Sequence, residues 1–313
     1  MAREIRDVSP TGYGSTTYEA VGNREDVSDI ITNIAPYDTP LYSRLRRTRA
    51  TATTHEWLED TLGEARVNKQ PEGYTYATEK VSSRVRLYNY TQIMHRGIYV
   101  TQTQEVVQKY GVRSEMAYQM QKEMKALAFD CEKAPITQDT KNAGTTSDMT
   151  RQFGGLPYWI VTNVVQAETS NAPNLTFDLI NTALQKTWTE GGKPTMLLMS
   201  PKNKRVISSF TAGNTKYMEG NNTHKLTHMI SVLETDFGTL QCHVDRFMPD
   251  DVVYGLSTEY IRKAFLRPFR QGTIPEVSDT HHKYVKGEWT LEMRAEKAHF
   301  KIENINDKVP KVG

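Results

Sequence analysis

The stretch from residue 51 to residue 100 most constrains the fold, because it predicts a long two-stranded excursion. The first strand-like run, Thr51 to Asp60, is rich in threonine and carries a tryptophan. The second, Val81 to Val100, alternates partly between its two faces. Pro71-Glu72-Gly73 between them is a turn signal. Since an isolated hairpin is marginally stable in water, we expect this excursion to pack on something else.

The composition is lean in core-forming residues for a chain of 313 residues. Hydrophobic residues make up 37%, and the set that counts glycine in place of tyrosine makes up about 38%, against ~45–50% in ordinary globular domains. The length still allows a sizeable core. The composition therefore favours an elongated or multi-part architecture in which partners supply some of the burial.

Several protein classes are excluded by charge, hydropathy and cysteine content. The net charge is +2 with 24% charged residues, which argues neither for disorder nor for a dedicated polyanion binder. No apolar run approaches the ~20 residues that span a bilayer, and the first residues lack the apolar centre of a signal peptide. Cys131 and Cys242 cannot form a disulfide framework. Synthesis in a reducing cytoplasm is the simplest interpretation.

The strongest helical signal lies between Ser114 and Lys133. Apolar side chains recur there at steps of three and four, which places them on one face of a helix roughly 30 Å long. They are Ala117, Met120, Met124, Leu127 and Cys131. Pro135 is predicted to end this helix.

The remaining segments predict a mixture of helices and strands, an α+β chain. Residues 1–25 are interpreted as an extended arm, followed by short helices near 26–34 and 39–45. Residues 175–270 resemble an α/β unit with a helix capped by Ser200-Pro201, a tight turn at 236–238 and a strand at 252–256. In residues 284–305 the apolar side chains Trp289, Leu291 and Met293 alternate with polar ones, and a turn or bulge is predicted near 296–298.

No segment carries the signature of a catalytic, metal or phosphate-binding site. His224 and His228 have a helical metal-pair spacing but lack the glutamate of HExxH. His281-His282 are adjacent, so in a strand they point to opposite faces. Asp250-Asp251 is interpreted as a turn, and the row Met116, Met120 and Met124 as core packing. We therefore expect no catalytic residue, no metal and no cofactor.

The most charged segment is the arginine cluster at residues 44–49. Arg44, Arg46, Arg47 and Arg49 are interleaved with apolar side chains. One interpretation is contact with phosphates. The favoured one is ion pairing with acidic groups of the same chain or a neighbour, because short charge runs usually decorate an amphipathic face.

Three stretches, taken in order, resemble the major capsid proteins of tailed bacteriophages, which have the Hong Kong ninety-seven-type capsid fold. They are ITNIAPYDTPLYS at 31–43, THEWLED at 54–60 and GEWTLEMRAEKAH at 287–299. The similarity runs from about Asp26 to Ile305. It implies an N-terminal arm (1–50), an extended β-hairpin loop (51–100), a peripheral domain with a long spine helix (101–165, completed by 280–306), an α/β axial domain (166–279) and a C-terminal tail (307–313).

The resemblance implies a structural protein of the virion, assembled in the host cytoplasm, with no enzymatic activity. Members of the family self-assemble into pentamers and hexamers that form an icosahedral head shell around packaged double-stranded DNA. Only about 25 residues precede the first matching motif, so a separate scaffolding protein is expected, together with a portal and a cement protein. No membrane partner is expected.

Candidate contact residues follow from the same layout. The hypothesis for inter-subunit contact names Pro71, Glu72 and Gly73 with Arg44, Arg46 and Arg47. A weaker hypothesis places Arg44 and Arg49 against DNA, in sequence-independent contact. Two alternatives stay open: a soluble enzyme with an unrecognised carboxylate or histidine site, and a DNA-binding module that uses Arg44–Arg49.

Overall fold

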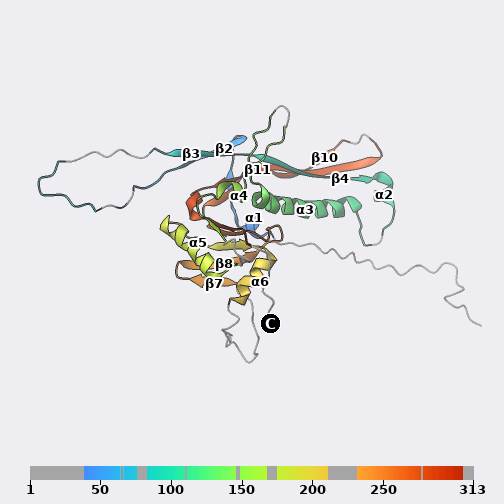
Figure 1. Ribbon diagram of the computed structural model, residues 1–313. Coiled ribbons are helices and arrows are strands. Elements are labelled where there is room, and N and C mark those ends of the chain that lie inside the picture. The colour runs from blue at the N-terminus through green and yellow to red at the C-terminus, as the bar shows by residue number, and fades with distance from the viewer. Residues whose placement is uncertain are drawn as a thin grey trace, which may run out of the picture.

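A computed structural model describes residues 39–63, 65, 67–75, 83–109, 111–145, 149–167, 175–210, 231–275 and 278–305. Two sheets and a separate two-stranded ribbon carry the architecture. The ribbon and the long end of the four-stranded sheet extend in opposite directions from the centre of the molecule, and the six-stranded sheet lies to one side of both (Figure 1). The predicted elongated, multi-part α+β architecture is confirmed.

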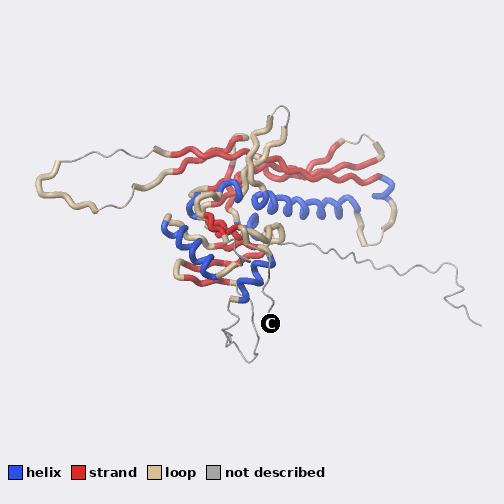
Figure 2. The backbone as a smooth tube through the Cα atoms, in the orientation of Figure 1, coloured by secondary structure: helices blue, strands red, loops and turns tan. Residues whose placement is uncertain are grey.

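The four-stranded sheet has the order β1-β10-β11-β4. Its strands are β1 (Arg46–Arg49), β10 (Ile261–Ile274), β11 (Thr280–Met293) and β4 (Gln92–Thr101). β1 runs parallel to β10, and the other neighbours are antiparallel. Three helices accompany this sheet: α1 (Pro40–Arg44), α2 (Gln102–Val106) and α3 (Glu115–Thr137). The long helix α3 runs beside β4 and β11 (Figure 2).

Helix α3 begins where the sequence predicts. The Ser114 hydroxyl accepts a hydrogen bond from the Ala117 N–H at 3.3 Å, and the Glu105 carboxylate accepts from the N–H groups of Glu115 and Met116. These acceptors satisfy backbone donors that the first turn leaves unpaired. The cap residue fixes the start of the helix locally, which is why it could be read from the sequence.

The end of α3 and part of its buried face differ from the prediction. Pro135 lies inside the last turn and the helix continues to Thr137, because a proline so near the end removes only one helical hydrogen bond and Gln138 N still donates to Ala134 O. Met124 and Ala117 are exposed. The buried stripe is instead Met116, Met120, Leu127, Cys131, Ala134 and Ile136.

The six-stranded sheet has the order β5-β12-β9-β6-β8-β7. Its strands are β5 (Val164–Gln166), β12 (Phe300–Glu303), β9 (Val253–Leu256), β6 (Met196–Met199), β8 (Gly238–Val244) and β7 (Val232–Thr235). Helices α5 (Phe177–Thr189) and α6 (Pro201–Ser209) pack on it, and the short helices α4 (Leu156–Trp159) and η1 (Glu296–Ala298) lie in its connections. The predicted Ser200 cap, the turn at 236–237 and the irregularity at 296–298 are confirmed.

The hairpin consists of β2 (Thr54–Glu59) and β3 (Val85–Tyr90), paired antiparallel from Thr54 opposite Tyr90 to Glu59 opposite Val85. The predicted turn is present: Tyr74 N donates to Pro71 O at 3.2 Å, and Gly73 has φ +79°. That positive φ suits glycine. The connection between β2 and β3 lies at the end of the ribbon that is remote from the rest of the molecule (Figure 2).

Strand pairing corrects how three segments were grouped from the sequence. Residues 92–101 belong to the four-stranded sheet rather than to the hairpin, and residues 261–274 pair with β11 rather than with the unit at 166–279. Residues 300–303 join the six-stranded sheet, beside β5 and β9. The physical reason is long-range pairing, which local patterns do not encode. The predicted segments 1–25, 26–34 and 307–313, with His224 and His228, lie outside the described residues.

A glycine in β9 provides a test of packing in the six-stranded sheet. A Cβ built at Gly255 would overlap the ring of Phe300, which is fully buried on β12. We expect Gly255→Ala to lower the free energy of unfolding by about 1–3 kcal/mol, the usual range for overpacking. Gly63→Ala is the control, since no atom lies within 4 Å of a Cβ there. Urea unfolding measures both, and equal effects would contradict the packing argument.

Candidate subunit-contact surface

The hairpin exposes apolar side chains over most of its described length. Leu62 is 98% exposed and Val67 is 84% exposed, both in the connection between the strands. The other exposed apolar side chains are Leu58, Tyr74, Val85 and Tyr88. Soluble monomers rarely show such surface together, and it usually marks a contact with another molecule. Across the ribbon, the ion pairs Arg86–Glu56 and Arg84–Asp60 are exposed and contribute little stability.

The root of the hairpin, by contrast, is fixed to β11 by buried polar groups. The Asn89 amide donates to Leu291 O at 2.8 Å and to Gly154 O at 3.0 Å, while its oxygen accepts from Gly154 N. His55 Nε2 lies 2.8 Å from a carboxylate oxygen of Glu292. The Glu59 carboxylate accepts from the N–H of Ala295 at 2.7 Å. The paired strands are thus held against the rest of the molecule, whereas the described residues of the connection beyond Glu59 are exposed.

Two glutamates on β11 form buried hydrogen bonds and ion pairs at and beside the root of the hairpin. Glu288 is 2% exposed and accepts hydrogen bonds from the Thr91 hydroxyl, from Arg151 and from Arg267. Glu292 is as deeply buried and is paired with His55 and Arg294. Burial alone would raise the pKa of both carboxyls, but these hydrogen bonds and charges hold each pKa below its usual value.

The sequence did not identify these glutamates. The alternation in 284–305 places Glu292 on a polar face, yet from Gly287 to Met293 every residue of β11 is buried, on both faces. The polar face is covered by the hairpin root and by the loop that contains Arg151. Partners 137 and 237 positions away leave no local signal in the sequence.

The arginine cluster lies along an exposed edge. Arg46, Arg47 and Arg49 are on β1, the edge strand of the four-stranded sheet, and all are exposed. Arg44 is exposed on α1 and donates to Pro40 O at 2.9 Å. None of the four forms an ion pair with a carboxylate of the described residues, so the favoured pairing within the chain is not observed there. Charges on an edge strand discourage unwanted strand pairing.

The candidate contact residues therefore fall into two separate places. Pro71, Glu72 and Gly73 form the turn in the connection between β2 and β3, whereas Arg44, Arg46 and Arg47 lie on α1 and β1 near the centre (Figure 1). The structure does not bring the two groups together within one chain. A surface that uses both would have to be completed by other copies.

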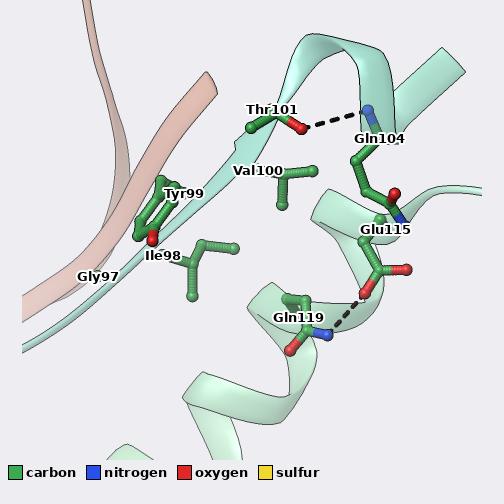
Figure 3. Close-up of a pocket in the computed structure, with 8 residues that line it drawn as sticks. All are labelled: Gly97, Ile98, Tyr99, Val100, Thr101, Gln104, Glu115 and Gln119. Carbon is green, nitrogen blue, oxygen red and sulfur yellow. Dashed lines mark hydrogen bonds between the residues drawn. The ribbon is translucent and has the colours of Figure 1, made fainter. Parts of the chain in front are cut away.

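The other candidate residues that the structure describes lie in separate places rather than in a catalytic or metal-binding arrangement. A hollow of about 410 Å³ lies between β4, α2 and the start of α3; there Gln119 donates to the Glu115 carboxylate and Gln104 N donates to the Thr101 hydroxyl (Figure 3). His282 stacks on Tyr99, and Asp250-Asp251 forms the predicted turn. Among the residues that the structure describes, no three metal-binding side chains cluster. Within the same ranges, no helix combines the length and the hydrophobicity that a membrane crossing needs.

Solved structures of shell-forming proteins share this fold. The capsid asymmetric unit of cyanophage A-1(L) aligns with a TM-score of 0.70 and 12% identity, covering 93% of this chain and 99% of that chain. The capsid of an empty GTA particle aligns with a TM-score of 0.62 at 12% identity, covering 93% and 98%. The holo-SrpI encapsulin complex from Synechococcus elongatus aligns with a TM-score of 0.59 at 10% identity, covering 91% and 93%. The predicted phage capsid fold is confirmed.

Sequence comparison identifies the family. The major capsid protein of Escherichia phage Phieco32 is 21% identical over 296 residues, covering 79% of this chain and 83% of that protein. Residues 11–306 match the family model described as SU10 major capsid protein. Since that match spans nearly the whole chain, the chain belongs to the SU10 major capsid protein family and is a structural subunit of a phage shell.

Proposed function

We propose that copies of this chain associate into pentamers and hexamers that close an icosahedral shell around packaged double-stranded DNA, and that each copy lays its hairpin on a neighbour. The observation that carries this proposal is the combination of a fixed root and an exposed apolar ribbon. A ribbon held in a defined direction can reach a neighbour without a large entropic cost of ordering. Contacts between unlike surfaces of identical subunits generate rings when the rotation closes.

The two groups of candidate residues then have separate roles. The turn at Pro71, Glu72 and Gly73 contacts the adjacent subunit at the end of the hairpin. Arg44, Arg46 and Arg47 meet acidic groups of another copy along the free edge of β1, and Arg44 and Arg49 add weak, sequence-independent contact with DNA. The exposure of all four arginines and the lack of described carboxylate partners support this division.

The family layout suggests how the remaining parts are used. We assign the four-stranded sheet with α3 to the peripheral domain and the six-stranded sheet with α5 and α6 to the axial domain. A scaffolding protein, a portal and a cement protein are expected partners of the shell in the host cytoplasm. The role is structural, and catalysis is not required of any residue in it.

Removing apolar surface from the hairpin connection is expected to block assembly without unfolding the subunit. We expect Leu62→Ser together with Val67→Ser to raise the concentration needed for shell formation at least tenfold. Burying one such side chain stabilises a contact by ~1.5–3 kcal/mol, and ~1.4 kcal/mol already corresponds to tenfold. Sedimentation velocity and negative-stain microscopy measure the assembled fraction, and circular dichroism checks the fold.

The matched control is Asn68→Ser with Gln70→Ser, which alters exposed polar residues of the same connection. This control should assemble like the wild type. Deleting residues 64–78 should give the same soluble, poorly assembling subunit as the double serine variant. Normal shells from either hairpin variant at the wild-type concentration would refute the proposed contact.

A further inference from the structure

Two buried carboxyl groups meet where α1, α3 and the loop after β8 come together. Glu132 on α3 is fully buried, and Asp245, directly after β8, is 2% exposed. The two carboxyl groups lie close enough together that Asp245 raises the pKa of Glu132. Neither forms an ion pair with any residue of the described ranges. Two acidic groups in contact, away from water, cannot both be ionised without a large electrostatic cost.

The hydrogen bonds of each carboxyl group show where a proton belongs. The oxygens of Glu132 accept from Leu41 N at 2.7 Å and from Tyr42 N at 2.6 Å, so this carboxyl group holds α1 by its backbone. Oδ1 of Asp245 accepts from Phe247 N at 2.8 Å. Oδ2 of Asp245 is buried and receives no donor from the described residues. An O–H on Glu132 would supply the missing donor.

The charges around the pair balance only when it holds one proton. Lys263 on β10 is buried and donates to the carbonyl oxygen of Tyr42, which places one positive charge beside Glu132. Burial raises the pKa of the Tyr42 hydroxyl and of the Cys131 thiol, so both stay neutral. The positive charge of the exposed Arg47 acts against the rise for Tyr42 and, together with burial, lowers the pKa of Lys263. On β8, burial and the charge of Arg44 likewise lower the pKa of His243.

Burial and the contact with Asp245 raise the pKa of Glu132 to about 8, although the two backbone N–H groups act against this rise. With one proton, the carboxyl pair carries a single negative charge that Lys263 offsets. Without it, two negative charges face one buried cation.

We propose that Glu132 and Asp245 share one proton, and that this carboxyl pair is a pH-sensitive latch that holds α1 against α3. The proton is bound to a Glu132 oxygen and is donated to Oδ2 of Asp245. Loss of this proton to solvent leaves two carboxylates in contact and weakens the attachment of α1. The latch does not depend on the proposed assembly contacts, because all of its groups lie in one chain.

The direction of the pH dependence follows from the raised pKa. The unfolded chain releases this proton near pH 4.3, the ordinary value for glutamate, while the folded chain keeps it until about pH 8. The stabilisation is therefore complete below the unfolded pKa, falls as the pH rises between the two values and is constant above the folded pKa.

The decisive variant is Asp245→Asn in the full chain. An amide keeps the oxygen that accepts from Phe247 N and replaces Oδ2 by an N–H donor aimed at Glu132, so the bridge no longer needs a proton. We expect the unfolding equilibrium constant of the wild type to rise relative to D245N between about pH 4.3 and about pH 8, by at most tenfold per pH unit. Asp250→Asn, in the exposed turn nearby, is the control and should follow the wild type.

Two further measurements on the unassembled chain test the proton and the latch separately. At pH 7, the infrared carbonyl band of a protonated carboxylic acid should be present in the wild type and in D250N and absent in D245N; in the wild type it should disappear by pH 9. Hydrogen exchange in residues 39–50 should be faster in the wild type than in D245N at pH 9, and equal at pH 5. Identical pH profiles for wild type and D245N, or no protonated band at pH 7, would overturn the proposal.

Discussion

Replacing Trp289 by alanine is expected to lower the free energy of unfolding by about 3–5 kcal/mol, the range for removing a buried tryptophan. Trp289 on β11 is fully buried, and its ring lies 4.9 Å from that of Phe153, 5.4 Å from that of Tyr42 and 6.4 Å from that of Phe265. Its indole N–H points at the sulfur of Met94 at 3.2 Å. One side chain thus joins α1, β4, β10 and the loop before α4.

Trp188→Ala is the matched control, because it removes the same side chain from an exposed site. Trp188 on α5 is 55% exposed, and its ring lies 6.2 Å from that of Phe237. We expect a cost of about 1 kcal/mol or less there. Guanidinium unfolding of both variants gives the comparison. Similar losses for the two tryptophans would show that Trp289 does not organise the core as described.

Replacing Glu288 by alanine is expected to lower the free energy of unfolding by about 3 kcal/mol. Breaking a buried ion pair from one side costs ~3–5 kcal/mol because the partner's charge stays without compensation. We expect the lower end of this range, because the Arg267 side chain is 53% exposed and water can solvate its charge. The Arg151 side chain is less exposed, at 28%, so the loss of its partner still has a cost. The variant also leaves the Thr91 hydroxyl without its acceptor.

The control for this change is Glu190→Ala. Glu190 pairs with Lys297 at 2.7 Å, but both side chains are well exposed, and exposed pairs contribute little to stability. Thermal unfolding at pH 7 distinguishes the two glutamates. A loss below 1 kcal/mol for Glu288→Ala would contradict the role given to the root of the hairpin.

Acid should weaken the same root. The pKa values of Glu288 and Glu292 are lowered in the folded chain. Their stabilisation is therefore present above the unfolded pKa and is lost as the pH falls through the lower folded values. Glu288→Ala should remove part of this acid sensitivity. The Glu132–Asp245 pair acts with the opposite sign and at higher pH, so a titration from pH 3 to pH 9 separates the two effects.

Local features explain which elements could be predicted. Ser114 and Ser200 cap their helices because each short hydroxyl side chain accepts a hydrogen bond from the N–H three residues later. The Pro71–Gly73 turn needs only glycine at a positive φ. The hairpin followed from two extended runs with a turn between them. These features depend on neighbours within a few residues along the chain.

The wrong or missing predictions involve partners far apart in sequence. Met124 has the period of a buried helix position but is exposed, because the sheet covers only part of that face of α3. Glu292 has the period of an exposed strand position but is buried, because the hairpin root covers the second face of β11. Periodicity reports which residues share a face. It does not report what lies against that face.

The amino-acid sequence by itself determined the helix starts, the turn and the strand-rich excursion, and its resemblance to phage capsid proteins indicated the family. The tertiary structure alone decided that β10 pairs with β11, that Glu288 and Glu292 become buried partners of arginines and a histidine, and that Glu132 meets Asp245 under α1. The physical reason is that burial and charge pairing depend on which surfaces meet in space. The hydrogen bonds of caps and turns, in contrast, are set within a few residues along the chain.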